Sequence, residues 1–213
     1  MTQANLPVAK LLARAALDSG RWTTRALAHA CLAFGLAAGV ASVQAQSHPL
    51  MPLCGACHGA DGNSSMPGTP SLAGQPKLFI ENQLVVIREG LREIPAMKGM
   101  LDKVKDEDFT ALAKIYSELP AKPSTSALDE AKAKRGADLA KQGLCGNCHL
   151  PDYSGREQMP RLAAQREDFL FANMTQFRDG TTTGRDTMMA SVLRGLSDAQ
   201  LGDLAHFFST RGR

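Results

Sequence analysis

Two short motifs place thiols and an imidazole in the same order at two positions of the chain. The first is CGACH at residues 54–58, and the second is CGNCH at residues 145–149. Cysteines three positions apart, with histidine directly after the second, are the signature of covalent haem attachment. The two thiols can reach the two vinyl groups on one edge of a porphyrin, while the next imidazole stands under the iron. Each motif therefore predicts one haem c.

Other chemistries of paired cysteines fit this pattern less well. A zinc site would need the two cysteine pairs to meet, and it would leave both adjacent histidines unexplained. A thioredoxin-like dithiol occurs in a βαβ context, which the sequence does not indicate. A disulfide is the third alternative. Two copies at the same place in a repeat, downstream of an export signal, favour covalent haem over all three.

The two motifs belong to an internal repeat. His58 and His149 are 91 residues apart, and other matches recur at offsets of 90 to 92. The matched segments are PSLAGQ (70–75) with PRLAAQ (160–165), IREG (87–90) with FRDG (177–180), and 97–117 with 189–209. The repeat predicts two domains, residues 46–122 and 123–213, joined through the Pro- and Ser-rich stretch 120–126.

The sequence of each half predicts helices joined by long loops rich in Gly, Pro and Asn. Apolar residues of the last segment recur at i, i+3, i+6 and i+7: Phe109, Leu112, Ile115 and Tyr116, then Leu201, Leu204, Phe207 and Phe208. Similar spacing predicts helices around residues 79–86 and 169–176. Asp106 and Ser197 are the expected N-caps of the last helices. The predicted fold is all-α.

The halves differ before their cysteine motifs. The second half has a predicted helix over residues 127–143, whereas the first has only residues 46–53, in which Pro49 and Pro52 limit helix formation. The helix expected over 106–119 would then lack a partner within its own domain. Either the second domain or another protein covers it, or the predicted start of the mature chain is misplaced.

The N-terminal segment resembles an export signal. Basic residues precede a stretch of small apolar residues, Ala26–Ala45, and we predict a signal peptide over 1–45, cleaved after Ala45. A retained membrane anchor is the alternative. The segment holds Trp22, Cys31, four of the 24 Lys and Arg residues and one of the 21 Asp and Glu residues, so the remainder is neutral, with 20 of each sign. That balance does not call for nucleic acid or an anionic membrane as partner.

The string CGACHGADGNS followed by PSLAGQ resembles the dihaem cytochrome c4 family, and the resemblance extends over essentially all of the mature chain. It implies two tandem class I cytochrome c-like domains, each wrapped around a covalently bound haem. It assigns one haem to Cys54, Cys57 and His58, and the other to Cys145, Cys148 and His149. It also implies that the carbonyls of Pro70 and Pro160 accept a hydrogen bond from these histidines, although ordinary turns could also explain both prolines.

The sixth iron ligand is predicted from the repeat. Met97 aligns with Met189, whereas Met100 aligns with Val192 and Met188 with Ala96. We therefore expect Met97 and Met189 to be the ligands, in agreement with the placement in the c4-like pattern. A thioether in this position raises the reduction potential and closes the iron to substrates. Met51 and Met66 lie close to the first motif and have no counterpart in the second repeat, whereas Met159 and Met174 are expected in the core or on the surface.

The resulting hypothesis is a periplasmic dihaem cytochrome, not an enzyme. It would carry single electrons from a donor dehydrogenase or quinol-oxidising complex to an acceptor such as a terminal oxidase. It would associate with a membrane only through a partner complex or an uncleaved signal. The alternative is a dihaem subunit of a periplasmic flavin, molybdenum or quinone dehydrogenase, because the short start of the first domain weakly resembles the dihaem subunit of flavocytochrome c sulfide dehydrogenases.

A haem peroxidase fits the sequence less well than either electron-transfer role. The motifs use all four mature cysteines, and His48 and His206 are expected on the surface rather than at iron. Arg88 and Arg178 recur in the repeat. Their expected roles are either pairing with haem propionates or lying at solvated helix ends.

Overall fold

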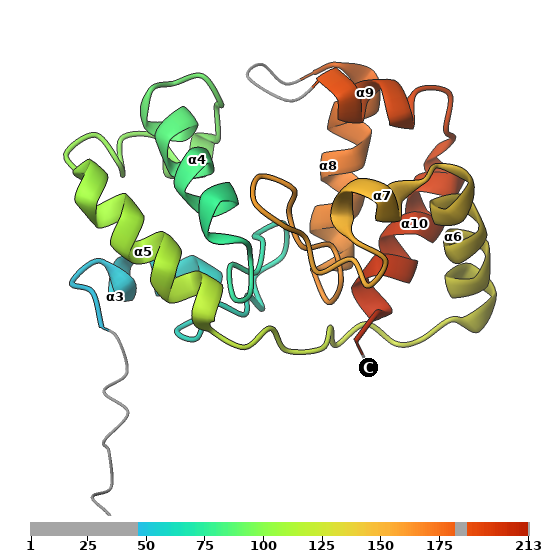
Figure 1. Ribbon diagram of the computed structural model, residues 1–213, viewed down its shortest axis with the longest axis horizontal. Helices are drawn as coiled ribbons and strands as arrows, with labels where there is room; N and C mark the ends of the chain where they lie inside the picture. Colours follow the sequence, from blue (N-terminus) through green and yellow to red (C-terminus); the bar gives the residue numbers. More distant parts are fainter. Residues whose placement is uncertain (1–46, 182–186, 213) are drawn as a thin grey trace, which may run out of the picture. The chain divides into compact units, whose positions relative to one another are not determined.

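The computed structural model describes residues 47–181 and 187–212 (Figure 1). The chain divides into two units, Met1–Ala45 and Gln46–Arg213, and every described residue belongs to the second. The predicted signal peptide, with Trp22 and Cys31, lies outside the described residues, and its cleavage after Ala45 stays a prediction. No helix in the described ranges combines the length and the apolar character needed to cross a bilayer.

Helices joined by loops build both halves. The first half contains α3 (Met51–His58), α4 (Lys77–Arg88), the 3-10 helix η1 (Pro95–Met97) and α5 (Asp106–Glu118). The second contains α6 (Glu130–Gln142), α7 (Cys145–His149), α8 (Glu167–Asp179), α9 (Thr187–Leu193) and α10 (Asp198–Thr210). Within residues 47–181 and 187–212 the only β-type pairing is an isolated bridge between Arg156 and Met159. The all-α prediction is confirmed.

Helix starts follow local capping chemistry. Ser197 caps α10 as predicted, because its side chain accepts from the Gln200 N–H and the Gln200 side chain bonds back to Ser197. Asp106 is not the cap of α5. That position belongs to Lys105, and Asp106 is the first helical residue, where its negative charge suits the helix dipole.

The apolar face of α5 is covered within the first half. Ile80 of α4 packs with three buried residues of α5, and Leu50, Met51 and Cys54 pack against the same cluster: Leu112, Ala113 and Tyr116. Pro52 lies in the first turn of α3, where the N–H it lacks would have no helical partner. The expectation that α5 lacks a partner in its own domain is therefore wrong, because α4 and the short start of α3 cover it.

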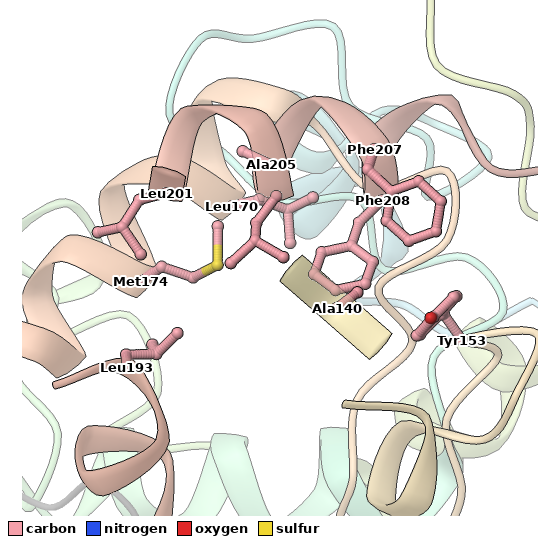
Figure 2. Close-up of a cluster of buried hydrophobic side chains, with 10 residues drawn as sticks. Ala140, Tyr153, Leu170, Met174, Leu193, Leu201, Ala205, Phe207 and Phe208 are labelled. Carbon is pink, nitrogen blue, oxygen red and sulfur yellow. The ribbon is translucent and has the colours of Figure 1, made fainter. Parts of the chain in front are cut away.

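The second half has a larger core, and in the described residues it has an additional helix, α6, before its cysteine motif. Figure 2 shows its side chains, which come from α6, α8, α9, α10 and the loop after α7. Tyr153 stands edge-on to two α10 rings, with centroid distances of 5.5 Å to Phe207 and 4.9 Å to Phe208. Helix α6 packs against α10 (Figure 1) so closely that a Cβ added at Gly136 would fall 2.1 Å from the Asp203 carbonyl oxygen.

The two clusters of buried side chains share no residue. One consists of residues from α4 and α5, the other of residues from α6 to α10 and their loops. Separate cores are what two tandem domains would have. The observation supports the division at residues 122 and 123, which stays a prediction.

Candidate haem-binding sites

The first candidate site is built on α3. This helix carries Cys54, Cys57 and His58 on its last two turns. The Nδ1 atom of His58 lies 2.9 Å from the carbonyl oxygen of Pro70. Because a carbonyl can only accept, the proton must be on Nδ1, which leaves the lone pair of Nε2 free to bind a metal.

The second site repeats this geometry on α7, which consists of the motif itself. The Nδ1 atom of His149 lies 2.8 Å from the Pro160 carbonyl oxygen. The His149 side chain is buried, and its Nε2 atom has no hydrogen-bond partner. An unpaired polar atom in the interior is costly. A haem iron bound to that nitrogen would satisfy it, so the residues fit the group.

Burial sets the protonation of these groups. It lowers the pKa of His58 and His149, although the bonds to Pro70 and Pro160 act in the opposite direction. Both imidazoles are therefore held in the neutral form, which is the form that binds metal. Burial also raises the pKa of the Cys54 and Cys145 thiols. A redox dithiol needs the opposite shift, so this result argues against that chemistry.

A zinc site finds no support in the geometry. Each cysteine pair lies on its own helix, α3 or α7. Across residues 47–181 and 187–212, no group of three or more His, Cys, Asp or Glu side chains lies close enough together to hold a metal ion. A structural zinc ion takes four such ligands.

The predicted methionine ligands are the more buried members of their pairs. Met97 ends η1 and is half-buried, whereas Met100 is exposed. Met189 of α9 packs against the core of the second half, whereas Met188 has a relative exposure of 62%. The order of burial agrees with the choice made from the repeat. The assignment of Met97 and Met189 as ligands stays a prediction.

Comparison with known proteins places these sites in a family. Residues 50–114 match the family described as "Cytochrome C oxidase, cbb3-type, subunit III". Cytochrome c4 of Azotobacter vinelandii is 31% identical, over 73% of this chain and 82% of that protein. The chain belongs to the cytochrome c4 family.

Two further matches extend over most of both chains. The crystal structure of reduced recombinant cytochrome c4 from Pseudomonas stutzeri superposes with a TM-score of 0.71 at 32% identity, covering 78% of this chain and 96% of that one. The thiosulfate dehydrogenase electron acceptor of Stutzerimonas stutzeri strain A1501 is 30% identical, over 84% of this chain and 94% of that protein. These relatives are electron-transfer proteins, and this cytochrome is likewise a dihaem electron-transfer protein with haem c as cofactor.

The recurring arginines of this cytochrome hold the start of each last helix. Each donates to the carbonyl two residues before the helix and to the first carboxylate of the helix. The pairs are Arg88 with Val104 (3.1 Å) and Asp106 (2.7 Å), and Arg178 with Leu196 (3.0 Å) and Asp198 (2.6 Å). These contacts account for the repeat of both arginines at helix ends, and pairing with haem propionates stays the alternative prediction.

The prediction that His206 lies on the surface is wrong. The residue is buried, its Nε2 atom accepts from the Asp129 N–H at 3.0 Å, and its Nδ1 atom lies 3.0 Å from a Glu167 carboxylate oxygen. Helix α6 covers this side of α10. With both ring nitrogens engaged, His206 is not placed to bind iron. His48 is half-buried, with Nε2 3.1 Å from an Asp108 carboxylate oxygen.

Proposed function

We propose that this protein is a periplasmic dihaem carrier that passes single electrons from a donor dehydrogenase or quinol-oxidising complex to a terminal acceptor such as an oxidase. The observation that carries the proposal is the repeated histidine–proline pair, together with the buried Nε2 atom of His149, which has no hydrogen-bond partner. The haem groups, when bound, supply a one-electron iron couple. The apolar stretch at residues 26–45 supports export to the periplasm.

The chain's own residues would attach, orient and enclose the two groups. The thiols of Cys54, Cys57, Cys145 and Cys148 would form the thioether links. His58 and His149 would hold iron through Nε2, each oriented by a carbonyl, that of Pro70 or Pro160. Met97 and Met189 would supply the second protein ligand of each iron. With both ligands bound, the iron would have no position for a substrate, which favours electron transfer over catalysis.

Spectroscopy of methionine variants tests this proposal. The purified protein should contain two haems per chain and show the far-red thioether–iron band. Met97→His and Met189→His should each remove half of that band and lower one reduction potential, because imidazole donates more strongly than a thioether. Met100→His and Met188→His are the matched controls, and they should keep both the band and the potentials. The proposal would be overturned if cyanide bound readily to both irons of the unsubstituted protein.

A second candidate function is to accept electrons as a bound subunit of a dehydrogenase. It is favoured by the match to a thiosulfate dehydrogenase electron acceptor over 94% of that relative. Co-purification of a second chain with the native protein would favour the subunit. A free monomer reduced by several donors would favour the carrier. Because the segment after residue 45 is neutral, reduction of a free carrier should depend only modestly on ionic strength.

A further inference from the structure

Each half of the protein has one buried glutamine whose side chain binds the backbone of the other half. Gln75 donates through Nε2 to the Arg161 carbonyl at 3.0 Å and accepts from the Arg161 N–H at 2.9 Å. Gln165 does the same with Ser71, at 2.9 Å and 2.8 Å. Gln75 and Gln165 have relative exposures of only 4% and 2%. Each side-chain amide therefore makes a two-point clasp on one backbone residue of the other half.

The clasped N–H groups belong to the peptide groups that orient the axial histidines. The Ser71 N–H and the Pro70 carbonyl are the two ends of one peptide group, and that carbonyl accepts from His58. The Arg161 N–H and the Pro160 carbonyl form the corresponding group, which accepts from His149. A continuous hydrogen-bond chain thus runs from each glutamine, through one peptide group, to the histidine of the opposite half.

The direction of both amides is fixed by their partners. A backbone N–H needs an oxygen opposite it and a backbone carbonyl needs an N–H, so neither glutamine can be turned over without losing both bonds. Burial strengthens such bonds, and bonds in series polarise one another. An acceptor on the N–H end of a peptide group makes the carbonyl at its other end a better acceptor.

We infer that each glutamine is a positioning residue for the haem of the other half, with Gln165 acting on His58 and Gln75 acting on His149. This inference rests on the proposed function, in which these histidines bind iron. A stronger carbonyl acceptor makes the imidazole a stronger donor to iron, because it draws the Nδ1 proton away from the ring. Stronger donation stabilises ferric iron and lowers the reduction potential.

The clasp also explains why the matched segments PSLAGQ and PRLAAQ share both their first and their last residue. PSLAGQ and PRLAAQ each begin with the proline that meets the histidine and end with the glutamine that crosses over. Arg161 adds a third contact in one direction, since its Nη2 atom donates to the Ala73 carbonyl at 2.9 Å. Residue 71 is a serine and makes no such contact through a guanidinium. The two clasps are therefore equivalent in their backbone bonds and unequal in their surroundings.

The test measures, in the full-length dihaem protein, whether replacing each glutamine shifts the reduction potential of the haem in the other half. Gln165→Leu should raise the potential of the His58 haem more than that of the other haem, and Gln75→Leu should do the reverse for the His149 haem. The two potentials are assigned by repeating each measurement in the Met97→His and Met189→His backgrounds, where one haem is moved to a lower potential. Gln158→Leu, at an exposed loop position, is the control and should change neither potential.

Two further measurements separate positioning from a general loss of structure. Gln165→Glu and Gln75→Glu keep an oxygen opposite the N–H in either protonation state, so they should not raise the potential as leucine does. In the reduced protein, the Nδ1 proton resonance should move for His58 in Gln165→Leu and for His149 in Gln75→Leu. If leucine blocks haem incorporation, the Nδ1 proton resonances are measured in the glutamate variants, where the His58 resonance should move in Gln165→Glu and the His149 resonance in Gln75→Glu.

Several outcomes would overturn the inference. These are equal shifts at both haems, a larger shift at the haem of the same half, or glutamate variants that behave like leucine. Failure of the proposed function has a different signature, because the unsubstituted protein would then lack the thioether–iron band. The inference alone fails when that band is present and the shifts are not crossed.

Discussion

Helices α5 and α10 occupy the same place in the repeat but have different neighbours. Helix α10 is contacted by both α6 and α8, whereas α5 is contacted by α4 and by the start of α3. The side of α5 that corresponds to the α6-facing side of α10 carries Lys114, which is exposed, where α10 carries the buried His206. Helix α6 thus accounts for the difference in burial at this position, whereas the His–Pro geometry is the same in both halves.

Two polar residues of α10 bind groups of α6 and its N-cap. Asp203 receives two bonds from the guanidinium of Arg135, at 2.7 Å and 2.8 Å, and His206 receives the N–H of Asp129. Position 111 of α5, the counterpart of Asp203, is an alanine. The described part of the first half has no counterpart of α6 on this side of α5, and the polar side chains that would bind such a helix are missing as well.

The largest expected effect comes from Gly136, where α6 crosses α10. A Cβ at this position would lie 2.1 Å from the Asp203 carbonyl oxygen and 2.5 Å from the Phe207 Cβ, so one helix must move. Gly136→Ala should destabilise the second half by about 3 kcal/mol and leave α5 unaffected. Hydrogen exchange of the α10 and α5 amides measures both effects.

Gly202→Ala is the matched control for this change. Gly202 lies within α10 with open space around its Cβ position. Its replacement should stabilise the helix by up to about 1 kcal/mol. Equal protection of α10 in the Gly136→Ala protein and the unsubstituted protein would contradict the tight crossing.

The next effect concerns His206 and its counterpart Lys114. His206→Leu leaves the Asp129 N–H and the Glu167 carboxylate without their partner, which should cost roughly 2 kcal/mol in the free energy of unfolding. Lys114→Leu removes only an exposed ion pair with Glu118 and should change stability by less than about 0.5 kcal/mol. Chemical denaturation of both variants tests the contrast. Similar losses would mean that α6 is not what distinguishes the two faces.

The sequence predicted the parts of the molecule that depend on local spacing. The two haem motifs, the helical segments and the Ser197 cap follow from residues within a few positions of one another. The error at Asp106 is a shift of one residue at a helix start, which capping patterns alone do not resolve. The His–Pro pairs, 11 and 12 residues apart, were expected only from the family resemblance.

Long-range polar contacts were beyond sequence reasoning. Gln75 and Gln165 end two matched segments of the repeat, but nothing in the sequence indicates their partners, which lie 86 and 94 residues away in the other half. Apolar periodicity identifies the buried face of a helix and does not say which polar side chain will find a partner. For His206 a signal was available. Its exchange for Lys114 coincides with the additional predicted helix over 127–143, and together they could have indicated a covered face.

Arg161 offers a third way to sharpen the comparison, because its counterpart is Ser71. Burial lowers the pKa of Arg161 to about 10, yet the group remains charged at neutral pH. A buried positive charge favours the reduced form of a nearby haem. Arg161→Gln should therefore lower the summed reduction potentials by on the order of tens of millivolts, which is the effect of a unit charge if it lies roughly 10 Å from an iron at an effective dielectric constant of about 20.

Lys122→Gln is the control for the loss of one positive charge. Lys122 is exposed and pairs with Asp61, so solvent screens its charge. Voltammetry of both variants should show a clearly larger decrease for Arg161→Gln. A decrease of the same size in both would mean that the buried position of Arg161 has no special influence on the haems.

The smallest expected difference appears in acid. Hydrogen bonds and neighbouring charges lower the pKa of one carboxyl group in the first half, Asp61, and of four in the second, Asp129, Asp152, Asp168 and Asp179. A carboxyl with a lowered folded-state pKa stabilises the protein above its unfolded value. That contribution is lost as the pH falls through the folded-state pKa. Below about pH 4 the second half should therefore lose more stability than the first.

Asp129→Asn separates this effect from helix capping. The Asp129 carboxylate accepts from the Lys132 N–H at 3.0 Å at the start of α6, and this bond is the main reason for its lowered pKa. Asparagine caps a helix about as well as aspartate but does not titrate. Hydrogen exchange of α6 and α10 in this variant should be the same at neutral pH and less sensitive to acid. An unchanged acid sensitivity would assign the difference between the halves to the other three carboxyl groups, none of which lies on α6.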